Sequence, residues 1–263
     1  MRALRTFVTA LILCLTASAP VYAGSNAADK EALALPVEDL IRLTKKVEGI
    51  AAERGARVFL LARVGRDPKE LPAGVEYTHV SFGVYSAITT ADGRVIPGYS
   101  VYNLYQRDDE PRVSDMVVDF PIDFMAGAHV LKAGVVIPTP ELQRRLLDLL
   151  SSGGYKQLHN PDYSAFSNPY NDRFQNCTEW VLDVINAAIY RTTDIAQLKA
   201  NTRAHFTAQT IRMNPFKLFF AQLFKPEVRL GDQRGPIQTV TFQAIADYLQ
   251  ANGLAEQVMR VEL

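Results

Sequence analysis

The sequence predicts an α+β fold in which an antiparallel sheet packs on helices, and three observations support it. Strand-like runs rich in Val, Leu, Phe and Tyr gather in the first 140 residues, whereas helical spacing of apolar residues dominates the remainder. Apolar residues make up 48% of the 263 residues, which is ample for a large core. The chain shows no internal repeat or low-complexity segment, and its length allows one large domain or one domain with an extension.

The expected elements follow in chain order. The first is an amphipathic helix over residues 36–54, where Leu40, Leu43 and Val47 share one side and Gly55 is a plausible stop. The remaining elements are strands 57–64, 77–85 and 94–106, an ambiguous short helix or extended segment over 113–128, strand 130–137, helix 140–150, a loop over 155–175, a helix from 176, helices 194–203, 215–224 and 241–252, and a last strand over 257–262.

The N-terminus has the features of a secretory signal. Arg2 and Arg5 precede an apolar run over residues 7–17, and small residues follow up to Ala23. The run is too short for a permanent membrane anchor, and no other stretch is apolar enough to span a bilayer. We therefore expect cleavage near Ala23, a flexible lead over 24–35, and a periplasmic or secreted product without an integral membrane segment.

Cleavage of the signal changes the cysteine count and the charge. Of the two cysteines, Cys14 leaves and Cys177 remains, so the mature chain cannot form an internal disulfide. Loss of two arginines takes the 28 positive residues to 26 against 28 negative ones, a net charge of about −2. The sequence has no basic run with interleaved aromatics, so nucleic acid is not an expected partner. Oligomeric state is not indicated.

The stretch from Gln175 to Ile185 predicts a helix with a thiol at its first turn. Asn176 is a good N-cap, and Glu179 stands where a carboxylate can reach back to the cap. Cys177 shares the apolar side of this helix, so its sulfur should face the body of the domain. The positive end of a helix favours a thiolate. The alternative is that Cys177 is a small buried core residue.

A strand histidine and a strand amide are the other polar residues of interest. His79, Ser81, Gly83 and Tyr85 share one face of strand 77–85, and His79 could act as a general base. Asn103 lies in the apolar part of the next strand, where an amide needs partners and could orient a histidine. A structural histidine and an ordinary satisfied asparagine remain the alternatives.

Two further segments allow a functional and a packing interpretation. The loop over 155–175 leads into Cys177, so Tyr163, Tyr170 and Asn171 could line a substrate site or only fill the crossover. Segment 215–224 is unusually apolar and is expected to pack on the core; the alternatives are an acyl-chain groove or contact with a membrane surface. The four histidines lack metal-ligand spacing, and no phosphate-binding glycine loop is present, so no metal or cofactor is expected.

The order of these motifs resembles a known group of enzymes. A His-Val-x-x-Gly strand, a polar residue one strand later and Asn-Cys-x-Glu at a helix start resemble the circularly permuted papain-like thiol enzymes. That branch includes the permuted NlpC-type hydrolases and the lecithin:retinol acyltransferase group. Tyr-x-His, Pro-Thr-Pro-Glu-Leu-Gln and Gln-Asn-Cys-x-x-Trp are similar to an uncharacterised bacterial exported family, domain of unknown function 2145. The similarity covers roughly residues 36–190.

The resemblance implies a permuted papain-like domain over 36–190, with a mainly helical extension over 191–263 packed on it. It also implies that Cys177 is the nucleophile, His79 its base and Asn103 the residue that orients the base, with an acyl-thioenzyme intermediate. Tyr85, Tyr163, Tyr170 and Asn176 would contact substrate. Many members carry histidine where this chain has Asn103.

Two hypotheses about function follow. The first is an exported cysteine hydrolase or acyltransferase that acts on an amide or ester bond of a cell-envelope small molecule, peptide or lipid. The second is a non-catalytic periplasmic binding or scaffolding protein on the same fold, in which Cys177 is only packed. The relative position of Cys177 and His79 distinguishes them.

Overall fold

The computed structural model describes residues 33–90, 92–214, 218, 222–223 and 225–263. The predicted signal peptide, most of the lead and most of segment 215–224 therefore lie outside the described residues. The helices in the described ranges are α1 (Val37–Glu53), α2 (Pro121–Ala126), α3 (Pro140–Ser151), α4 (Cys177–Tyr190), α5 (Ile195–His205) and α7 (Phe242–Ala251), with short 3-10 turns η1 (Pro68–Glu70) and η2 (Gly154–Leu158).

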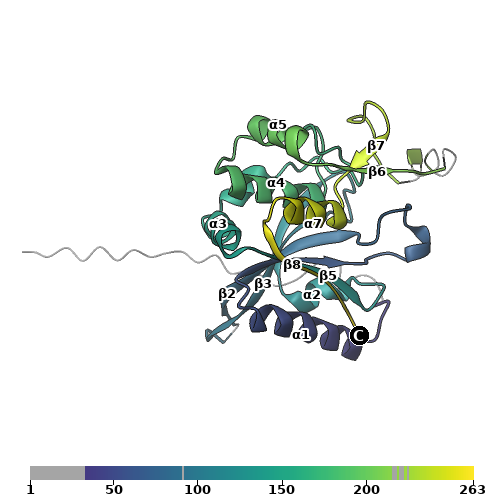
Figure 1. Cartoon of the computed structure of the whole chain (residues 1–263). Coiled ribbons are helices and arrows are strands. Elements are labelled where there is room, and N and C mark those ends of the chain that lie inside the picture. The colour runs from purple at the N-terminus through teal and green to yellow at the C-terminus, as the bar shows by residue number, and fades with distance from the viewer. Residues whose placement is uncertain (1–32, 91, 215–217, 219–221, 224) are drawn as a thin grey trace, which may run out of the picture.

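A six-stranded antiparallel sheet forms the centre of the molecule, in the order β4-β3-β2-β1-β5-β8. Helices α1 and α2 cover one face of this sheet, and α3, α4, α5 and α7 lie on the other side (Figure 1). The six strands and a separate two-stranded sheet have these bounds: β1 (Val58–Arg63), β2 (His79–Thr89), β3 (Val95–Gln106), β4 (Ser114–Asp119), β5 (Lys132–Pro138), β8 (Ala255–Glu262), and the pair β6 (Gln209–Ile211) and β7 (Ile237–Thr239).

Side-chain alternation in the strands divides the core into two clusters, one on each face of the sheet. On the face that α4 covers, called here the α4 face, Val80 and Phe82 of β2 pack with Trp180 and Cys177. On the opposite, α1 face, Phe124 of α2 packs among residues of α1, β1 and β5. Neighbouring residues of β2 therefore face opposite sides of the sheet, and its apolar residues Val80, Phe82 and Val84 belong to the core on the α4 face.

Most predicted elements are present within a few residues of their expected bounds. The ambiguous segment 113–128 resolves into edge strand β4 followed by the short helix α2. The C-terminal part does more than pack on the domain, because β8 pairs with β5 and extends the central sheet. The fold is thus a mixed α/β structure around one sheet; it supports the predicted α+β class.

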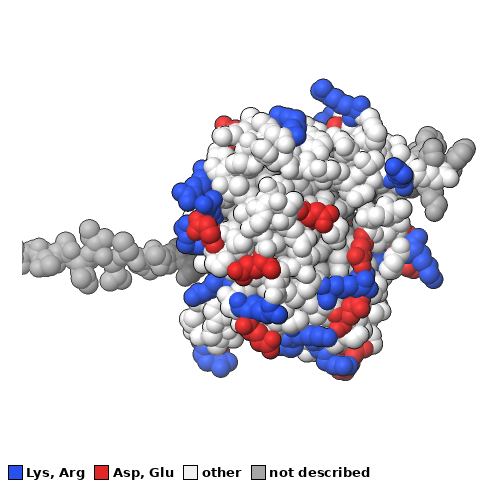
Figure 2. Space-filling view, in the orientation of Figure 1, with Lys and Arg blue, Asp and Glu red and all other residues white. Residues whose placement is uncertain are grey.

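No helix in the described ranges is long and apolar enough to cross a membrane. On the face drawn in Figure 2, Lys and Arg alternate with Asp and Glu, and the charges gather in its lower part. That face therefore offers no broad basic surface of the kind that nucleic-acid binding uses.

Candidate functional site: a cleft at the start of α4

The first turn of α4 is fixed by its predicted cap. Asn176 Oδ1 accepts a hydrogen bond from the Glu179 backbone N–H at 2.9 Å, and its amide Nδ2 donates to Ala165 O at 3.1 Å. The Glu179 side chain does not return to the cap as predicted; it turns away to Lys199. Asn176 therefore ties the start of α4 to the preceding loop without a reciprocal capping box.

Cys177 follows the cap and lies against the backbone of β2. Its Sγ donates a weak hydrogen bond to Thr78 O at 3.9 Å. Burial raises the pKa of the thiol, and the backbone N–H groups of Val80 and Thr178 lower it by less. The expected thiolate at the helix terminus is therefore not favoured, since desolvation outweighs the helix end.

Cys177 nevertheless lines a cleft of about 270 Å³. Asn176, Cys177 and Thr178 form part of its wall, and the loop after β1 and the loop before β7 form others. Apart from four charged residues, the other residues that line the cleft are uncharged, and most of them are apolar: Leu71, Pro72, Val75, Tyr77, Thr78, Gln106, Tyr163, Ala165, Phe166, Met213, Val228, Thr239, Val240 and Thr241. A concave, largely apolar site with a few polar groups is typical of a small-ligand site.

Four charged side chains, two of each sign, also line this cleft. They are Arg66, Lys225, Glu70 and Glu227. None of the four forms an ion pair with another residue in the described part of the chain. Tyr163, Cys177 and Arg66 all line this cleft. Burial raises the pKa of Tyr163, Cys177 adds to this, and the charge of Arg66 opposes it.

His79 lies on the other face of the sheet. Its ring stacks on Tyr105 with the centroids 4.9 Å apart and meets the edge of Phe124 at 5.4 Å, and Phe124 belongs to the core on the α1 face. Cys177 belongs to the core on the α4 face, and His79 does not line its cleft. The predicted Cys177–His79 pair is therefore not formed, because the β2 backbone separates the two side chains.

Asn103 does lie beside His79, as predicted, but both belong to a buried network on the α1 face. Asn103 Nδ2 donates to Asp119 Oδ1 at 2.7 Å, and Tyr105 Oη donates to Asp119 Oδ2 at 3.0 Å. Burial and the charge of Arg63 lower the pKa of His79 well below its usual value, although Asn103 favours its charged form. His79 packs on the α1 face against Phe124, away from Cys177, and its lowered pKa makes it a weak base, so it is not placed to take a proton from Cys177.

Burial also affects the acid of this network. It raises the pKa of Asp119 to about 7, against the hydrogen bond from Tyr105. Three buried atoms form no well-placed hydrogen bond with any described residue: Arg63 Nε, His79 Nε2 and Asn103 Oδ1. Buried polar groups without hydrogen-bond partners lower the stability of the fold, so this network is expected to destabilise the folded protein.

The predicted substrate-binding residues divide into two groups. Tyr163 and Asn176 line the cleft with Cys177. Tyr85 is exposed on β2, where it contacts Tyr99 at 5.5 Å, and Tyr170 Oη bridges Phe206 O and the Ala208 N–H. Tyr85 and Tyr170 therefore do not line the cleft, and Tyr170 instead contacts the backbone just after α5.

Sequence reasoning missed the charged side chains of the cleft. Arg66 and Glu70 lie in a loop and a 3-10 turn that look like ordinary polar surface, and Lys225 and Glu227 lie more than 150 residues further along the chain. A local signal existed for another missed group: Glu179 and Asp183 are two carboxylates one turn apart on an otherwise apolar helix. Such carboxylates need a buried partner.

Comparison with known proteins gives the family. The chain belongs to a family described as an uncharacterized protein conserved in bacteria (DUF2145), whose model matches residues 50–249. No curated protein and no solved structure matches the chain. The match extends past residue 190 and therefore includes α5 and most of α7.

Proposed function

We propose that this chain is an exported, non-catalytic binding protein that takes a small amphipathic ligand into the cleft at the start of α4. The observation that carries the proposal is the composition of the cleft: apolar walls with unpaired charges of both signs. The predicted signal sequence supports export. The position of His79 against Phe124 on the opposite face argues against acyl transfer through a Cys177–His79 pair.

The charges suggest which ligand the cleft accepts. A short peptide with free ends carries a carboxylate for Arg66 or Lys225 and an ammonium group for Glu70 or Glu227. Its side chains can pack against the apolar walls, which supply most of the contact area. Hydrogen bonds to charged groups contribute about 1.5–3 kcal/mol each, so the ends of the peptide should matter to affinity.

Reversal of one cleft charge tests this proposal. Arg66→Glu is expected to weaken binding of the tripeptide trileucine about tenfold, because a carboxylate would then face the peptide carboxylate. Isothermal titration calorimetry measures the dissociation constant. The difference should shrink in high salt, since Arg66 is exposed.

Lys69→Glu provides the matched control, because Lys69 is an exposed cation of the same loop region that does not line the cleft. It should change the affinity less than about twofold. Trileucine blocked at both ends should bind more weakly than the free peptide. Equal losses in both variants, or no binding of the free peptide, would refute the proposal.

A thiol-dependent activity is the second candidate, because the Cys177 sulfur lines the cleft. The permuted papain-like resemblance belongs to this candidate. It would need a base other than His79, and the cleft offers no histidine among its described lining residues. Cys177 would then act from within the cleft on a bound acyl compound.

Alkylation of Cys177 separates the two candidates. In the binding protein, iodoacetamide should label Cys177 at least about tenfold more slowly than free cysteine near neutral pH, because the thiol is buried and its pKa is raised. His79→Ala should leave this rate unchanged within about twofold. Mass spectrometry of the peptide that contains Cys177 measures the rate.

The controls are Cys177→Ser, which should not be labelled, and a circular dichroism spectrum that shows His79→Ala to be folded. Labelling faster than free cysteine, together with slowing in His79→Ala, would mean that the two side chains meet in solution. That result would restore the enzyme hypothesis.

A further inference from the structure

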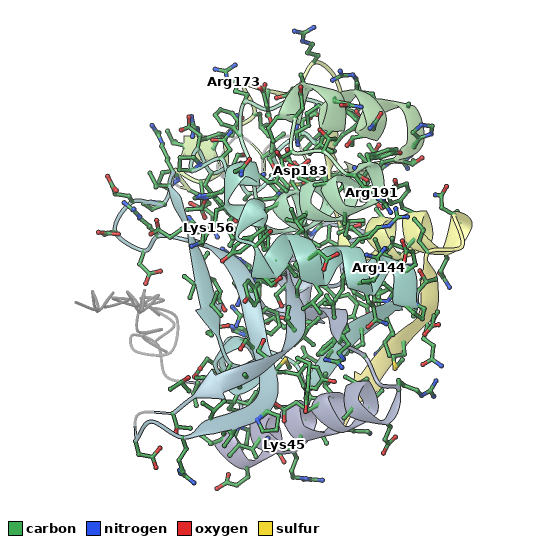
Figure 3. All side chains as sticks on the ribbon, turned by 90° about the vertical axis from the view of Figure 1, so that its left-hand side faces the viewer. Lys45, Arg144, Lys156, Arg173, Asp183 and Arg191 are labelled. Atoms are coloured by element: carbon green, nitrogen blue, oxygen red, sulfur yellow. The ribbon has the colours of Figure 1, made fainter. Side chains whose placement is uncertain are left out.

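The two edge strands of the central sheet differ in how they are covered. At β4, the Ser114 N–H donates to Pro161 O at 3.0 Å, and Val113 forms an isolated bridge with Asp162. At β8, the outer side forms no backbone hydrogen bond with any described residue. Figure 1 shows β8 between α7 and α1, and Figure 3, turned by 90°, shows α7 and β8 at the right-hand margin of the molecule. The outer edge of β8 is therefore open to a partner strand.

Alternate residues of β8 present their backbone groups to this open edge. The Leu263 N–H donates to Leu131 O at 3.4 Å, in line with the register of the β5–β8 pair. Hydrogen-bonded pairs recur at every second residue of an antiparallel ladder, so the odd-numbered residues from 257 to 263 bond to β5. The N–H and C=O groups of Val258 and Arg260 therefore point to the open side.

Both ends of the open edge are altered. The carbonyl of Glu262, which also points outward, accepts a hydrogen bond from Lys46 Nζ of α1 at 2.6 Å. At the other end the register shifts by one residue opposite Pro138, so Glu256 lies in a β-bulge. The part of the edge that a second strand can pair with is therefore short and centred on Val258.

The charges beside Val258 make this edge complementary to itself. Glu256 and Arg260 are exposed, carry opposite charges and lie two residues before and two residues after Val258. Glu256 forms no ion pair with any described residue. Arg260 contacts Glu76 at 3.3 Å and also pairs with Glu262. If Val258 lies opposite its own copy in an antiparallel pair of two β8 strands, each Glu256 faces an Arg260 of the second copy.

Two neighbouring registers place like charges together. With Met259 opposite its own copy, Glu256 faces Glu262 of the second copy. With Arg260 opposite its own copy, the two guanidinium groups face each other. Like charges directly opposite each other destabilise a strand pair, so of these three registers the one centred on Val258 is favoured. Charged residues on an edge also disfavour pairing with strands that lack the matching charges.

We propose that β8 pairs antiparallel with β8 of a second copy of this chain and so joins the two central sheets across a twofold axis. Val258 lies on the axis, where its N–H and C=O bond to the same groups of the second copy. The contact between Glu256 and Arg260 forms twice, once on each side of the axis. The association is weak and reversible, because one short strand forms it and its charges are exposed.

A second copy fits this edge better than an unrelated strand does. The chain itself supplies both members of the charge pair, at equal distances from Val258 along the strand. No residue of β8 lines the Cys177 cleft, so both copies keep an open cleft in the dimer. The inference therefore does not depend on peptide binding in that cleft.

Sedimentation velocity of the full exported chain over a range of concentrations tests the proposal. We expect a monomer–dimer equilibrium with a dissociation constant between about 1 μM and 1 mM. Glu256→Arg should raise this constant at least about tenfold, because two arginines then face each other on both sides of the axis. Adding Arg260→Glu should return it to within about threefold of the original value, since the reversed charges are again complementary.

Val258→Pro tests the backbone contact. Proline lacks the outward N–H, whereas the residues on either side of it bond to β5, so the variant should fold and stay monomeric. Circular dichroism checks that it is folded. Asp109→Arg is the matched control, because it makes the same change of charge at an exposed residue between β3 and β4, beside the opposite edge of the sheet. It should change the dissociation constant less than about twofold.

Three results would overturn the proposal. They are a chain that is still monomeric at about 1 mM, a folded Val258→Pro variant that dimerises as before, and a double variant that associates as weakly as Glu256→Arg alone. The second result would mean that the two copies meet at another surface. Trileucine binding should be the same in Val258→Pro as in the unaltered chain, so failure of either proposal is separable from failure of the other.

Discussion

Replacement of Lys199 by alanine is expected to lower the free energy of unfolding by about 3–5 kcal/mol, because it leaves two buried carboxylates without the one cation that pairs with them among the described residues. Lys199 is 4% exposed, so water cannot replace its ammonium group without opening the layer between α4 and α5. The loss should be among the largest of any single charge removal in the chain. Urea denaturation followed by circular dichroism measures it.

The loss should depend on pH in a defined direction. Without Lys199, burial and mutual repulsion raise the folded-state pKa values of Glu179 and Asp183 above their unfolded values. Stability is then fully present below the unfolded carboxyl pKa and is lost as the pH rises through the raised folded values. Lys199→Ala should therefore be less stable near pH 8 than near pH 5.

Two comparisons make the prediction specific. Adding Glu179→Gln and Asp183→Asn to Lys199→Ala should recover more than half of the loss, since no buried charge then remains unpaired. Lys69→Ala, at an exposed cation without an ion pair in the described ranges, should cost less than about 1 kcal/mol. If Lys199→Ala costs as little as Lys69→Ala, the contact between Lys199 and its two carboxylates is not buried in solution.

Local sequence patterns predicted the elements well where one pattern controls the outcome. The cap at Asn176 and the apolar spacing after it determine α4, and the structure confirms both. Segment 113–128 remained ambiguous because β4 is an edge strand whose pairing with β3 is a tertiary contact. The end of the chain joined the central sheet by a pairing with β5 that no local pattern encodes.

The relative position of Cys177 and His79 was the main error, and the sequence contained a signal against it. Alternation already placed Val80 and Phe82 on one face of β2 and His79 on the other. Cys177 lies on the apolar side of an apolar helix, and such a side packs on the more apolar face of a strand, which is the face of Val80. Motif order gives no information about the face on which a side chain lies.

The position of the Cys177 cleft depends on α4, so removal of the residue that fixes this helix should have a large effect. Trp180 is fully buried one turn after Cys177 and meets Phe82 of β2 at 5.7 Å between ring centroids. Trp180→Ala is expected to lower the free energy of unfolding by about 3–5 kcal/mol, because it leaves a large cavity between α4 and the sheet. Urea denaturation measures the change.

Trp180→Phe separates packing from hydrogen bonding. The indole Nε1 of Trp180 is buried without a hydrogen-bond acceptor among the described residues, so phenylalanine loses volume but no polar contact. Its cost should be about 1–2 kcal/mol, and trileucine binding in the cleft should persist. A loss equal to that of Trp180→Ala would mean that the indole nitrogen has a partner in solution. A loss below about 1 kcal/mol in Trp180→Ala would mean that α4 is not held by the sheet, and the cleft at its start would have no fixed wall.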